Sequence, residues 1–483
     1  MKHPITQRLA VLACMVACSV TSLAHAAGFD AVEGIAAKGF DVSAQAVLLD
    51  GNTTLGAIAP RAMLTPASVS KLYISAASLD RFGPQKRFTT RLVTTGEVES
   101  NGTLRGDIIL DGAGDPGLTS NDYWMLVQGL KQLGVKRVRG NVLVSEWRFG
   151  PVPCISTDRC RARTSSRHAY DALLSSAAVD FANWCVRVYP GSKVGEPAHL
   201  QGCFGEKALT AVDSSIKTVA TTQPTRISGA RVTSGSTDTL KLDGTIALDT
   251  FPRNIYRASA DPAQQSLYTL VDLMHQADIT VTGNATLSRT RPPADATVLA
   301  SVDGPTLQEL LLRMMNYSNN FMADVLALDL SSTTPATLAN ASAALERFVA
   351  TVPGHGPVTL QSGSGLTTQN KTSAHGLIAL LNEMYHRPAL FPVFVAGMQA
   401  PVNGPMRFIR RGSDVFQNNI MIKTGTLNQP VPVRAVAGYF RTRQGRWGAF
   451  AVMVNGRAAT PYLRWKDVLE AVSKDLTPMI ENH

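Results

Sequence analysis

A serine and a lysine stand three residues apart in the stretch TPASVSKLY, residues 65–73. Thr65 is a residue type that caps helices and Pro66 suits the first helical position, so the stretch predicts a helix that begins just before Ser68. In such a helix Lys71 lies on the same face as Ser68. A buried, neutral lysine can accept the proton of a serine hydroxyl, and the unpaired N–H groups of a first turn favour developing negative charge. The pair therefore indicates nucleophilic catalysis by Ser68.

A polar stretch much later in the chain holds a second candidate group. NYSNN, residues 316–320, interrupts two apolar segments with helical spacing, and such a turn can hold Ser318 and Asn320 inward against the first helix. A plain connection between two helices is the alternative interpretation of this stretch.

A third motif, IKTGTL at residues 422–427, carries a lysine on one face of a predicted strand. Gly425 lets another backbone approach closely, and a strand edge that ends in Lys-Thr-Gly-Thr can bind a carboxylate and pair with an extended peptide. Lys423, Thr424 and Thr426 are therefore candidate substrate-binding residues, together with Gly425.

Each motif is a weak signal by itself. SSIK, for example, gives Ser214 and Lys217 the same spacing as the first pair, but no capped helical run surrounds it, and we interpret it as chance. The three motifs become informative together, because each occurs in the setting that its chemistry needs.

The elements that must position these motifs can be predicted from hydrophobic patterns. From residue 28 to about 88 the chain is expected to form strand, turn, strand and helix, with Asp50-Gly51 as the hairpin turn. The last third offers three successive strands, NIMIKTGTL, VRAVAGYF and RWGAFAVMVNG, and a closing helix at 462–476. Three adjacent strands predict an antiparallel sheet.

A long segment separates the first two motifs. We expect residues 27–90 and 300–483 to form one split domain and residues 91–299 to form an insertion. Within the insertion, 91–150 with 260–299 is predicted to be α/β, and 151–259, rich in Thr, Ser and Gly, is predicted to be β-rich.

The cysteines indicate disulfides. Four of the six lie in the predicted insertion, at Cys154, Cys160, Cys185 and Cys203. The simplest pairing is 154 with 160 and 185 with 203, although three pairings are compatible with the sequence. Metal binding is not expected, because the sequence has neither CxxC spacing nor paired histidines.

The N-terminus resembles an export signal. Lys2 and Arg8 precede an apolar run and the small-residue pattern Ala24-His25-Ala26, so we expect a signal peptide at residues 1–26 and a periplasmic location. A membrane anchor and a lipoprotein signal at VLAC or MVAC are the alternatives. The net charge of +10 allows loose association with an anionic membrane surface or wall polymer, and no dense basic tract points to nucleic acid.

Taken in order, S-x-x-K, S-x-N and K-T-G are the active-site signature of penicillin-recognising serine enzymes. The chain resembles their D-Ala-D-Ala carboxypeptidase/endopeptidase family, soluble low-molecular-weight penicillin-binding proteins with an insertion between the first two motifs. LTPASVSKL, SNNFMADVL, SGSGL and KTGTL with AVAGYF resemble its motifs, and GDIILDGAGDPGL and VKRVRGNVLV are similar to segments of its insertion. The resemblance implies an α/β (α+β) penicillin-binding transpeptidase-like domain, an antiparallel sheet flanked by helices, interrupted by a large β-rich insertion.

The resemblance also implies roles and partners. Ser68 would be acylated, Lys71 would accept its proton, Ser318 would relay a proton to the leaving amine, and Asn320 would hold the substrate amide. Lys423, Thr424 and Thr426 would hold the terminal carboxylate, and the N–H groups of Ser68 and Thr426 would form the oxyanion hole. The expected substrates are peptidoglycan stem peptides and the expected inhibitors are β-lactams, with no cofactor and no metal.

Three departures from the family pattern are visible. Asn319 and Ser362 stand where the family has Asp, and RTSSRHAYDALL offers no convincing match for an insertion carboxylate that faces the diaminopimelate side chain in relatives. Tyr317-Ser318-Asn319 also fits Y-x-N, but the S-x-N register brings the following FMAD into line with the family.

Two other functions remain as alternatives. A serine β-lactamase is disfavoured by the long insertion and by the lack of a Glu-x-x-x-Asn segment after residue 320. A non-catalytic binding protein for β-lactams or peptidoglycan is disfavoured by the intact motif residues.

Overall fold

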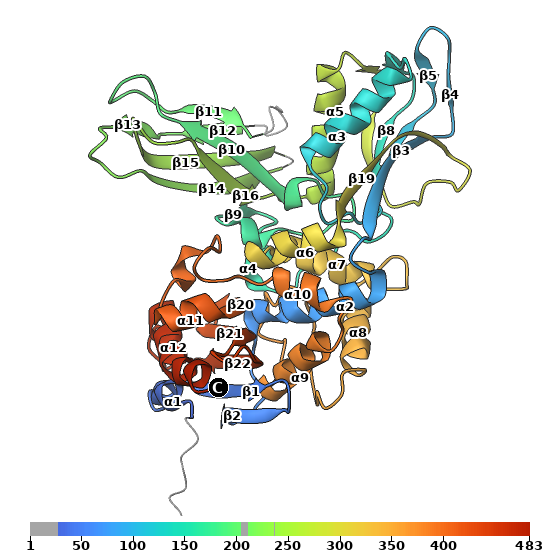
Figure 1. Ribbon diagram of the computed structural model, residues 1–483. Coiled ribbons are helices and arrows are strands. Elements are labelled where there is room, and N and C mark those ends of the chain that lie inside the picture. Colours follow the sequence, from blue (N-terminus) through green and yellow to red (C-terminus); the bar gives the residue numbers. More distant parts are fainter. Residues whose placement is uncertain (1–27, 204–210, 236) are drawn as a thin grey trace, which may run out of the picture.

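The computed structural model describes residues 28–203, 211–235 and 237–483. The predicted signal peptide, residues 1–26, lies outside this range. The described chain forms a lower body and two lobes above it (Figure 1). The lower body contains both ends of the described chain, and the lobes are built from the segment between α2 and α6.

A five-stranded antiparallel sheet forms the centre of the lower body. Its strand order, β2-β1-β22-β21-β20, joins the first and last parts of the chain in one sheet. The strands are β1 (Asp41–Leu48), β2 (Thr53–Ile58), β20 (Ile420–Leu427), β21 (Val433–Arg441) and β22 (Trp447–Asn455).

Both faces of this sheet are buried, which explains the near-continuous apolar runs in β21 and β22. Large side chains such as Val436 and Phe450 point to one face, where they pack against the last helix. Small side chains such as Ala435, Ala437 and Ala451 point to the other face. Because alanine leaves room, a short 3₁₀ helix, η1 (Ala67–Ser70), packs directly on β20 and β21. That helix carries the Ser68 motif.

Helices cover the two faces of the sheet. The face with large side chains packs against α1 (Asp30–Ala36), α11 (Asp414–Asn419) and α12 (Trp465–Glu481). The other core contains a group of helices that are mostly buried. They are α2 (Lys71–Phe82), α6 (Leu307–Asn316), α7 (Asn320–Asp329), α8 (Leu338–Val349), α9 (Ala374–Tyr385) and α10 (Phe391–Ala396). The short η4 (Arg407–Ile409) lies near α12.

The upper right lobe in Figure 1 is a mixed sheet with two helices. Its strand order is β18-β8-β6-β3-β19, and a smaller sheet β17-β7-β5-β4 adjoins it. The elements are β3 (Arg87–Thr94), β4 (Glu97–Val98), β5 (Thr103–Arg105), β6 (Ile108–Asp111), β7 (Arg137–Val138), β8 (Val142–Ser145), β17 (Thr280–Val281), β18 (Ala285–Ser288), β19 (Thr297–Thr306), α3 (Ser120–Gln132) and α5 (Pro262–Gln276).

The upper left lobe consists of two small sheets, β11-β10-β16 and β12-β15-β14-β9, with β13 paired to β15. The strands are β9 (Ser165–Ser166), β10 (Asn183–Tyr189), β11 (His199–Gly202), β12 (Ala211–Ser214), β13 (Lys217–Val219), β14 (Arg226–Ser234), β15 (Thr237–Ala247) and β16 (Arg253–Ala258). Along the chain, α4 (Thr157–Arg161) precedes β9, and η2 (Ala169–Asp171) and η3 (Asp180–Ala182) lie between β9 and β10. Disulfides join Cys154 to Cys160 and Cys185 to Cys203, the simplest of the predicted pairings.

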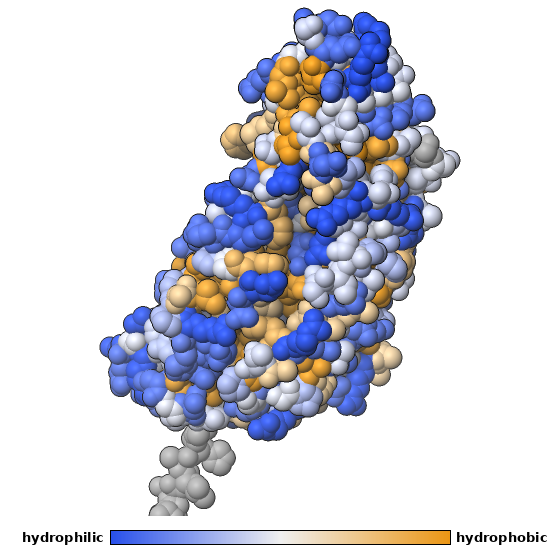
Figure 2. All heavy atoms as spheres, turned by 90° about the vertical axis from the view of Figure 1, so that its right-hand side faces the viewer, coloured by the Kyte–Doolittle hydropathy of each residue, from blue (hydrophilic) through white to orange (hydrophobic). Residues whose placement is uncertain are grey.

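The predicted fold class is confirmed, with one difference at the N-terminal side. Helix α1 precedes the first strand, where a strand was expected first. The predicted domain boundaries at 90 and 300 fall inside β3 and β19, which pair with each other, so the division into units stays a prediction. Figure 2 shows a face on which hydrophobic residues form separate patches among polar ones. Within the described ranges, no helix has the length and apolar character to cross a bilayer.

Candidate active site

Ser68 lies in η1, directly before α2, so the predicted single helix is divided into a 3₁₀ turn and an α-helix. The predicted Thr65 cap is wrong: no side chain caps η1, and the Thr65 hydroxyl instead donates to the Thr368 carbonyl and accepts from Lys371 Nζ. Ser68 is half-buried, whereas its neighbours on both sides are buried. Its hydroxyl is therefore the accessible group of this turn.

Lys71 is fully buried and touches three oxygen atoms. Its Nζ lies 3.2 Å from Ser68 Oγ, 2.7 Å from Asn320 Oδ1 and 2.8 Å from the Ser364 carbonyl oxygen. Burial, and after it the charges of Lys423 and Arg159, hold the pKa of Lys71 well below its ordinary value, although Asp324 acts in the opposite direction. A neutral amine has two N–H groups, which suit the two carbonyl oxygens, and one lone pair, which is then left for the Ser68 proton.

Ser318 lies in the turn between α6 and α7. Its backbone φ of 53° is in the left-handed region, which is rare for a residue with a side chain and is found at functional sites. Lys423 Nζ donates to Ser318 Oγ at 3.0 Å and to the Thr424 carbonyl at 2.7 Å. Burial lowers the pKa of Lys423 to about 7. Tyr317, the alternative of the Y-x-N register, is 65 % exposed.

Gly425 brings strand β20 against η1. A Cβ atom at this position would lie 2.3 Å from the Pro66 carbonyl oxygen and 3.0 Å from the Ser68 nitrogen, so the contact requires glycine. The next residue, Thr426, is exposed, and Trp465 Nε1 donates to its Oγ1 at 3.0 Å. The close approach places the K-T-G strand along the turn that carries the serine, as a peptide-binding edge must lie.

A cavity of about 530 Å³ opens over Ser68. The lower body contributes residues of all three motifs to its wall, namely Ser68, Ser318, Asn320, Thr424 and Thr426. The opposite wall comes from the segment before and after β9, including Asp158, Arg161, His168, Tyr170 and Asp171.

The segment around β9 also contacts the motif residues directly. Asn320 Nδ2 donates to the Tyr170 carbonyl at 3.3 Å, and the Tyr170 ring stacks on His168 with 4.7 Å between ring centres. The upper left lobe is therefore part of the site, although the sequence placed all candidate catalytic residues in the split domain.

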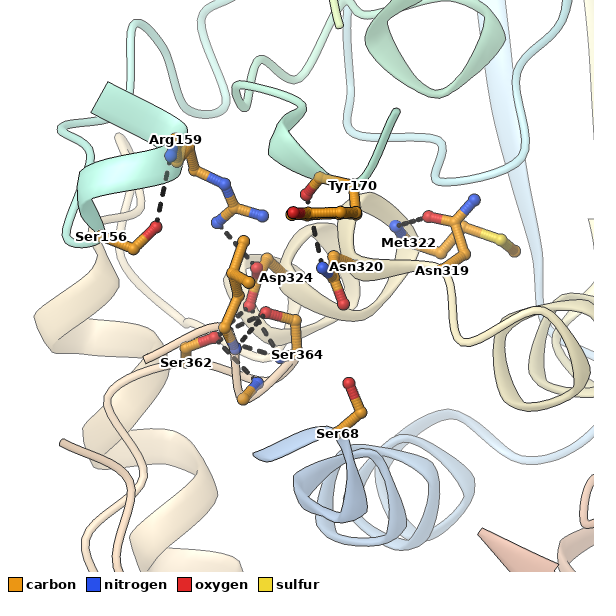
Figure 3. Close-up of polar contacts among 12 residues, drawn as sticks. Ser68, Ser156, Arg159, Tyr170, Asn319, Asn320, Met322, Asp324, Ser362 and Ser364 are labelled. Carbon is orange, nitrogen blue, oxygen red and sulfur yellow. Dashed lines mark hydrogen bonds and ion pairs between the residues drawn. The ribbon is translucent and has the colours of Figure 1, made fainter. Parts of the chain in front are cut away.

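A buried ion pair lies above Ser68 in the view of Figure 3. Arg159 reaches from α4 to Asp324 on α7, with Nη1 2.8 Å from Oδ2 and side chains 3 % and 0 % exposed. Asp324 also accepts from the Ser362 hydroxyl at 2.8 Å and from the Ser364 N–H at 2.9 Å. Burial alone would raise the pKa of Asp324, but Arg159 and the Ser364 N–H outweigh it and hold that pKa below its ordinary value.

This pair connects to Lys71 through a short loop. Ser364 donates its N–H to Asp324 and offers its carbonyl to Lys71 Nζ. The Ser362 hydroxyl, which replaces the expected Asp of DGSGL, donates to Asp324 and accepts from the N–H of Ser364 and of Gly365, both at 3.2 Å. The hydrogen bonds at this position are therefore made without a second carboxylate.

Sequence reasoning named neither member of the ion pair as a site residue. Asp324 had a signal, because a carboxylate inside the apolar run FMADVLALDL must find a partner. Arg159 had none, since one arginine in the short stretch CISTDRC gives no local sign of a distant partner. Two further carboxylates, those of Asp158 and Asp171, lie in the cavity wall. Asp171 belongs to the stretch RTSSRHAYDALL, and the sequence alone identified neither residue as part of the site.

The remaining predicted residues lie as follows. Asn319 is half-buried and caps α7 by accepting the Met322 N–H at 3.0 Å, a role that Asp can also fill. Ser214 and Lys217 lie on strands β12 and β13, away from the motif residues, which agrees with a chance match. Of the four cysteines, Cys154 and Cys160 flank the turn that carries Arg159.

Comparisons with known proteins identify relatives of the whole chain. The model of the D-Ala-D-Ala carboxypeptidase 3 (S13) family matches residues 42–473. D-alanyl-D-alanine carboxypeptidase of Actinomadura sp. (strain R39) is 26 % identical over 434 residues, which are 84 % of this chain and 76 % of that protein.

Solved structures give the same fold. Penicillin binding protein 4 from Haemophilus influenzae superposes with a TM-score of 0.75 at 19 % identity, covering 93 % of this chain and 99 % of that chain. The same protein complexed with a novel β-lactam gives a TM-score of 0.70 at 19 % identity and the same coverage.

Proposed function

Because the chain belongs to the D-Ala-D-Ala carboxypeptidase 3 (S13) family, we propose that Ser68 is the nucleophile of a serine DD-peptidase acting on peptidoglycan stem peptides. The proposed reaction removes the terminal D-Ala, or cuts a cross-link formed through D-Ala, by way of an ester on Ser68. β-Lactams would inhibit it by acylating the same atom. The observation that carries the proposal is the buried contact of Lys71 Nζ with Ser68 Oγ and two carbonyl oxygens.

In the first step Ser68 Oγ attacks the carbonyl carbon of the penultimate D-Ala while its proton passes to the lone pair of Lys71. The carbonyl oxygen becomes an anion that the N–H groups of Ser68 and Thr426 would stabilise. Lys423 with Thr424 and Thr426 would hold the carboxylate of the terminal residue. A bound carboxylate favours the charged form of Lys423, whose pKa burial lowers to about 7 in the free site.

In the second step the C–N bond breaks and the proton that Lys71 received goes to the leaving amine. Ser318 would relay it, since Lys423 Nζ orients the Ser318 hydroxyl by donating to its oxygen. Asn320 would donate its Nδ2 to the carbonyl of the substrate's acyl side, which requires that group to replace the Tyr170 carbonyl that it contacts in the free site. Water then hydrolyses the ester and restores Ser68.

Labelling with a fluorescent penicillin tests this proposal. The expected result is a covalent band that survives denaturation, is absent in Ser68→Ala and is strongly reduced in Lys71→Ala, together with D-Ala release from a peptide ending in D-Ala-D-Ala. Rapid loss of the penicillin without a lasting band would indicate a β-lactamase instead. Intact penicillin without a band would indicate a non-catalytic binding protein.

We also propose export to the periplasm through residues 1–26. The supporting features are the cationic start, the apolar run and the small-residue pattern before Ala27. Mass spectrometry of the protein recovered from a periplasmic extract should give an N-terminus at Ala27. Recovery of the protein only from the cytoplasm with an intact N-terminus would contradict export, and acylation of Cys14 or Cys18 would indicate the lipoprotein alternative. Loose attachment to anionic wall polymer stays a prediction from the net charge.

A further inference from the structure

Arg434, on strand β21, is a buried arginine without a carboxylate partner. Three arginines are buried within the ranges that the structure describes, Arg159, Arg231 and Arg434, which are 3 %, 0 % and 2 % exposed. Arg159 pairs with Asp324 at 2.8 Å, and Arg231 lies 3.6 Å from Asp238. Among the described residues, Arg434 makes no ion pair with a carboxylate. A buried positive charge without a counter-charge costs free energy, so a counter-charge brought by a ligand would stabilise it.

Neutral oxygen atoms hold the guanidinium where strand β20 ends. Nη1 donates to the carbonyl oxygens of Leu427 and Val433, at 2.9 and 2.8 Å, and Nη2 donates to Asn428 Oδ1 at 2.9 Å. Burial lowers the pKa of Arg434, but an arginine stays protonated in proteins. The charge is therefore fixed in position and present in the free site.

Two aromatic rings near the start of α12 cover the guanidinium. Cζ of Arg434 lies 5.7 Å from the ring centre of Tyr462 and 5.9 Å from that of Trp465. Rings at such distances attract a cation but carry no net charge, so they offset only part of the cost of burial. Trp465 is also the residue whose Nε1 donates to Thr426 Oγ1, and this contact joins the arginine, through the ring, to the K-T-G-T strand.

The charge of Arg434 lies beside the end of the cavity that is proposed to receive a carboxylate. Arg434 is directly opposite Thr426 in the register of β21 with β20, and opposite side chains of an antiparallel pair lie on the same face of the sheet. Thr426, Leu427 and Asn428 line the cavity over Ser68, whereas Arg434 lies behind them. An anion bound at Thr426 would therefore be attracted by a charge that no carboxylate of the described chain neutralises.

We propose that Arg434 is a positioning residue whose charge makes this site select substrates with a free terminal carboxylate. The inference rests on the proposed function of Ser68, and adds a second cation to the direct contacts proposed for Lys423, Thr424 and Thr426. The carboxylate of the bound substrate supplies the counter-charge that Arg434 lacks in the free site. A substrate with a neutral end supplies none, and so gains nothing from this arginine.

Two thioesters that differ in one group test this role. Both carry the same N-acyl-D-alanyl group, joined in one to thioglycolate, which ends in a carboxylate, and in the other to thioglycolamide, which ends in a neutral amide. Release of the thiol measures the turnover of each. Arg434→Gln and Arg434→Met remove the charge, and Arg434→Lys keeps it. Arg441→Gln is the matched control, because Arg441 is an exposed arginine at the other end of β21 that contacts the ring of Trp447.

Loss of the charge should act on one of the two substrates. In Arg434→Gln and Arg434→Met, KM for the thioglycolate ester should rise by about tenfold or more, the scale on which one nearby charge changes an equilibrium, while kcat stays within about twofold. Turnover of the thioglycolamide ester should stay within about twofold, which also shows that the variants are folded. Arg434→Lys should recover part of the preference for the carboxylate, and the control should keep both activities.

Several results would overturn the inference. An equal loss on both thioesters in both charge-removing variants would show that Arg434 only supports the fold of the turn. An unchanged preference in these variants, a loss of preference in Arg434→Lys as large as theirs, or the same loss in the control would show that the charge is not the cause. Wild-type protein that cleaves both thioesters with the same kcat/KM would refute this role alone. Wild-type protein that cleaves neither and does not react with penicillin would refute the proposed function, and this role with it.

Discussion

Arg159 and Asp324 should set the pH at which the serine becomes reactive, because both charges act on Lys71. Arg159 lowers the pKa of Lys71 and Asp324 raises it, in addition to the larger effect of burial. The neutral form of Lys71 is the proton acceptor, so acylation is active above that pKa and falls as the pH drops through it. The pair can be perturbed one charge at a time, by Arg159→Met and by Asp324→Asn.

The two variants should move the acid limb of the pH–rate profile, the pH range in which acylation falls off, in opposite directions. Without Arg159, the unopposed Asp324 raises the pKa of Lys71, and the limb moves to higher pH. Without the Asp324 charge, the unopposed Arg159 lowers that pKa further, and the limb moves to lower pH. A single nearby charge shifts a pKa by about one unit or more, and one unit is about tenfold in the neutral fraction on the limb.

Both variants should also lose stability, by about 3–5 kcal/mol, since each leaves a charge buried without its partner. The double variant removes both charges, and should recover part of that stability and place the limb near its wild-type position. The assay is the second-order rate of labelling by fluorescent penicillin at a series of pH values, with thermal unfolding measured alongside. Limbs that move in the same direction, or do not move, would show that the pair acts on the fold and not on the protonation of Lys71.

Three further predictions concern other parts of the molecule. Ser318→Ala should reduce acylation by about 10² or more, while exposed Tyr317→Phe should cost far less; the reverse result in penicillin labelling would favour the Y-x-N register. Replacing Cys154 and Cys160 by Ser should slow acylation, because their disulfide closes the turn that carries Arg159. The same change at Cys185 and Cys203 should leave the acylation rate unchanged, and equal effects of the two changes in labelling assays would contradict this. Burial raises the pKa of Asp115 from 3.8 to about 7, so the folded state binds this proton more tightly than the unfolded state and stability falls as pH rises between those values. Asp115→Asn should therefore increase the free energy of unfolding at pH ~8 by up to about 4 kcal/mol and make that free energy less dependent on pH. Denaturant titrations at a series of pH values measure this, and curves equal to those of the wild type would refute the raised pKa of Asp115.

The fold class could be predicted because the central sheet has simple local signals. Strands β20, β21 and β22 are long apolar runs separated by turns, and the first hairpin has its Asp50-Gly51 turn. The pattern did not show that β1 pairs with β22, since that contact joins residues from opposite ends of the chain. Helix α1 was missed because its seven residues are too few to show a helical period.

The candidate site could be predicted only where short motifs carry the chemistry. Ser68, Lys71, Ser318 and Lys423 are brought together by contacts that the motifs imply, but nothing local links Arg159 to Asp324. That pair joins α4 to α7, and the position of α4, which packs against β9, depends on how the upper left lobe folds. The wall formed by the segment around β9 was missed for the same reason, since loop conformation is set by tertiary contacts.

Ser362 stands where the family pattern has Asp, and this difference affects the protonation of Lys71, the proposed base. A carboxylate at this position would stand within hydrogen-bond distance of Asp324, because the Ser362 hydroxyl is 2.8 Å from Oδ1. Two carboxylates so close repel each other, so keeping both ionised costs free energy, and any added negative charge would raise the pKa of Lys71. The serine keeps the hydrogen bonds to Asp324, Ser364 and Gly365 and adds no charge. Asp324 alone then balances Arg159, and burial together with the charge of Lys423 can keep Lys71 neutral. A loop residue that touches neither Ser68 nor the cavity thus helps to set the protonation state on which the proposed nucleophile depends.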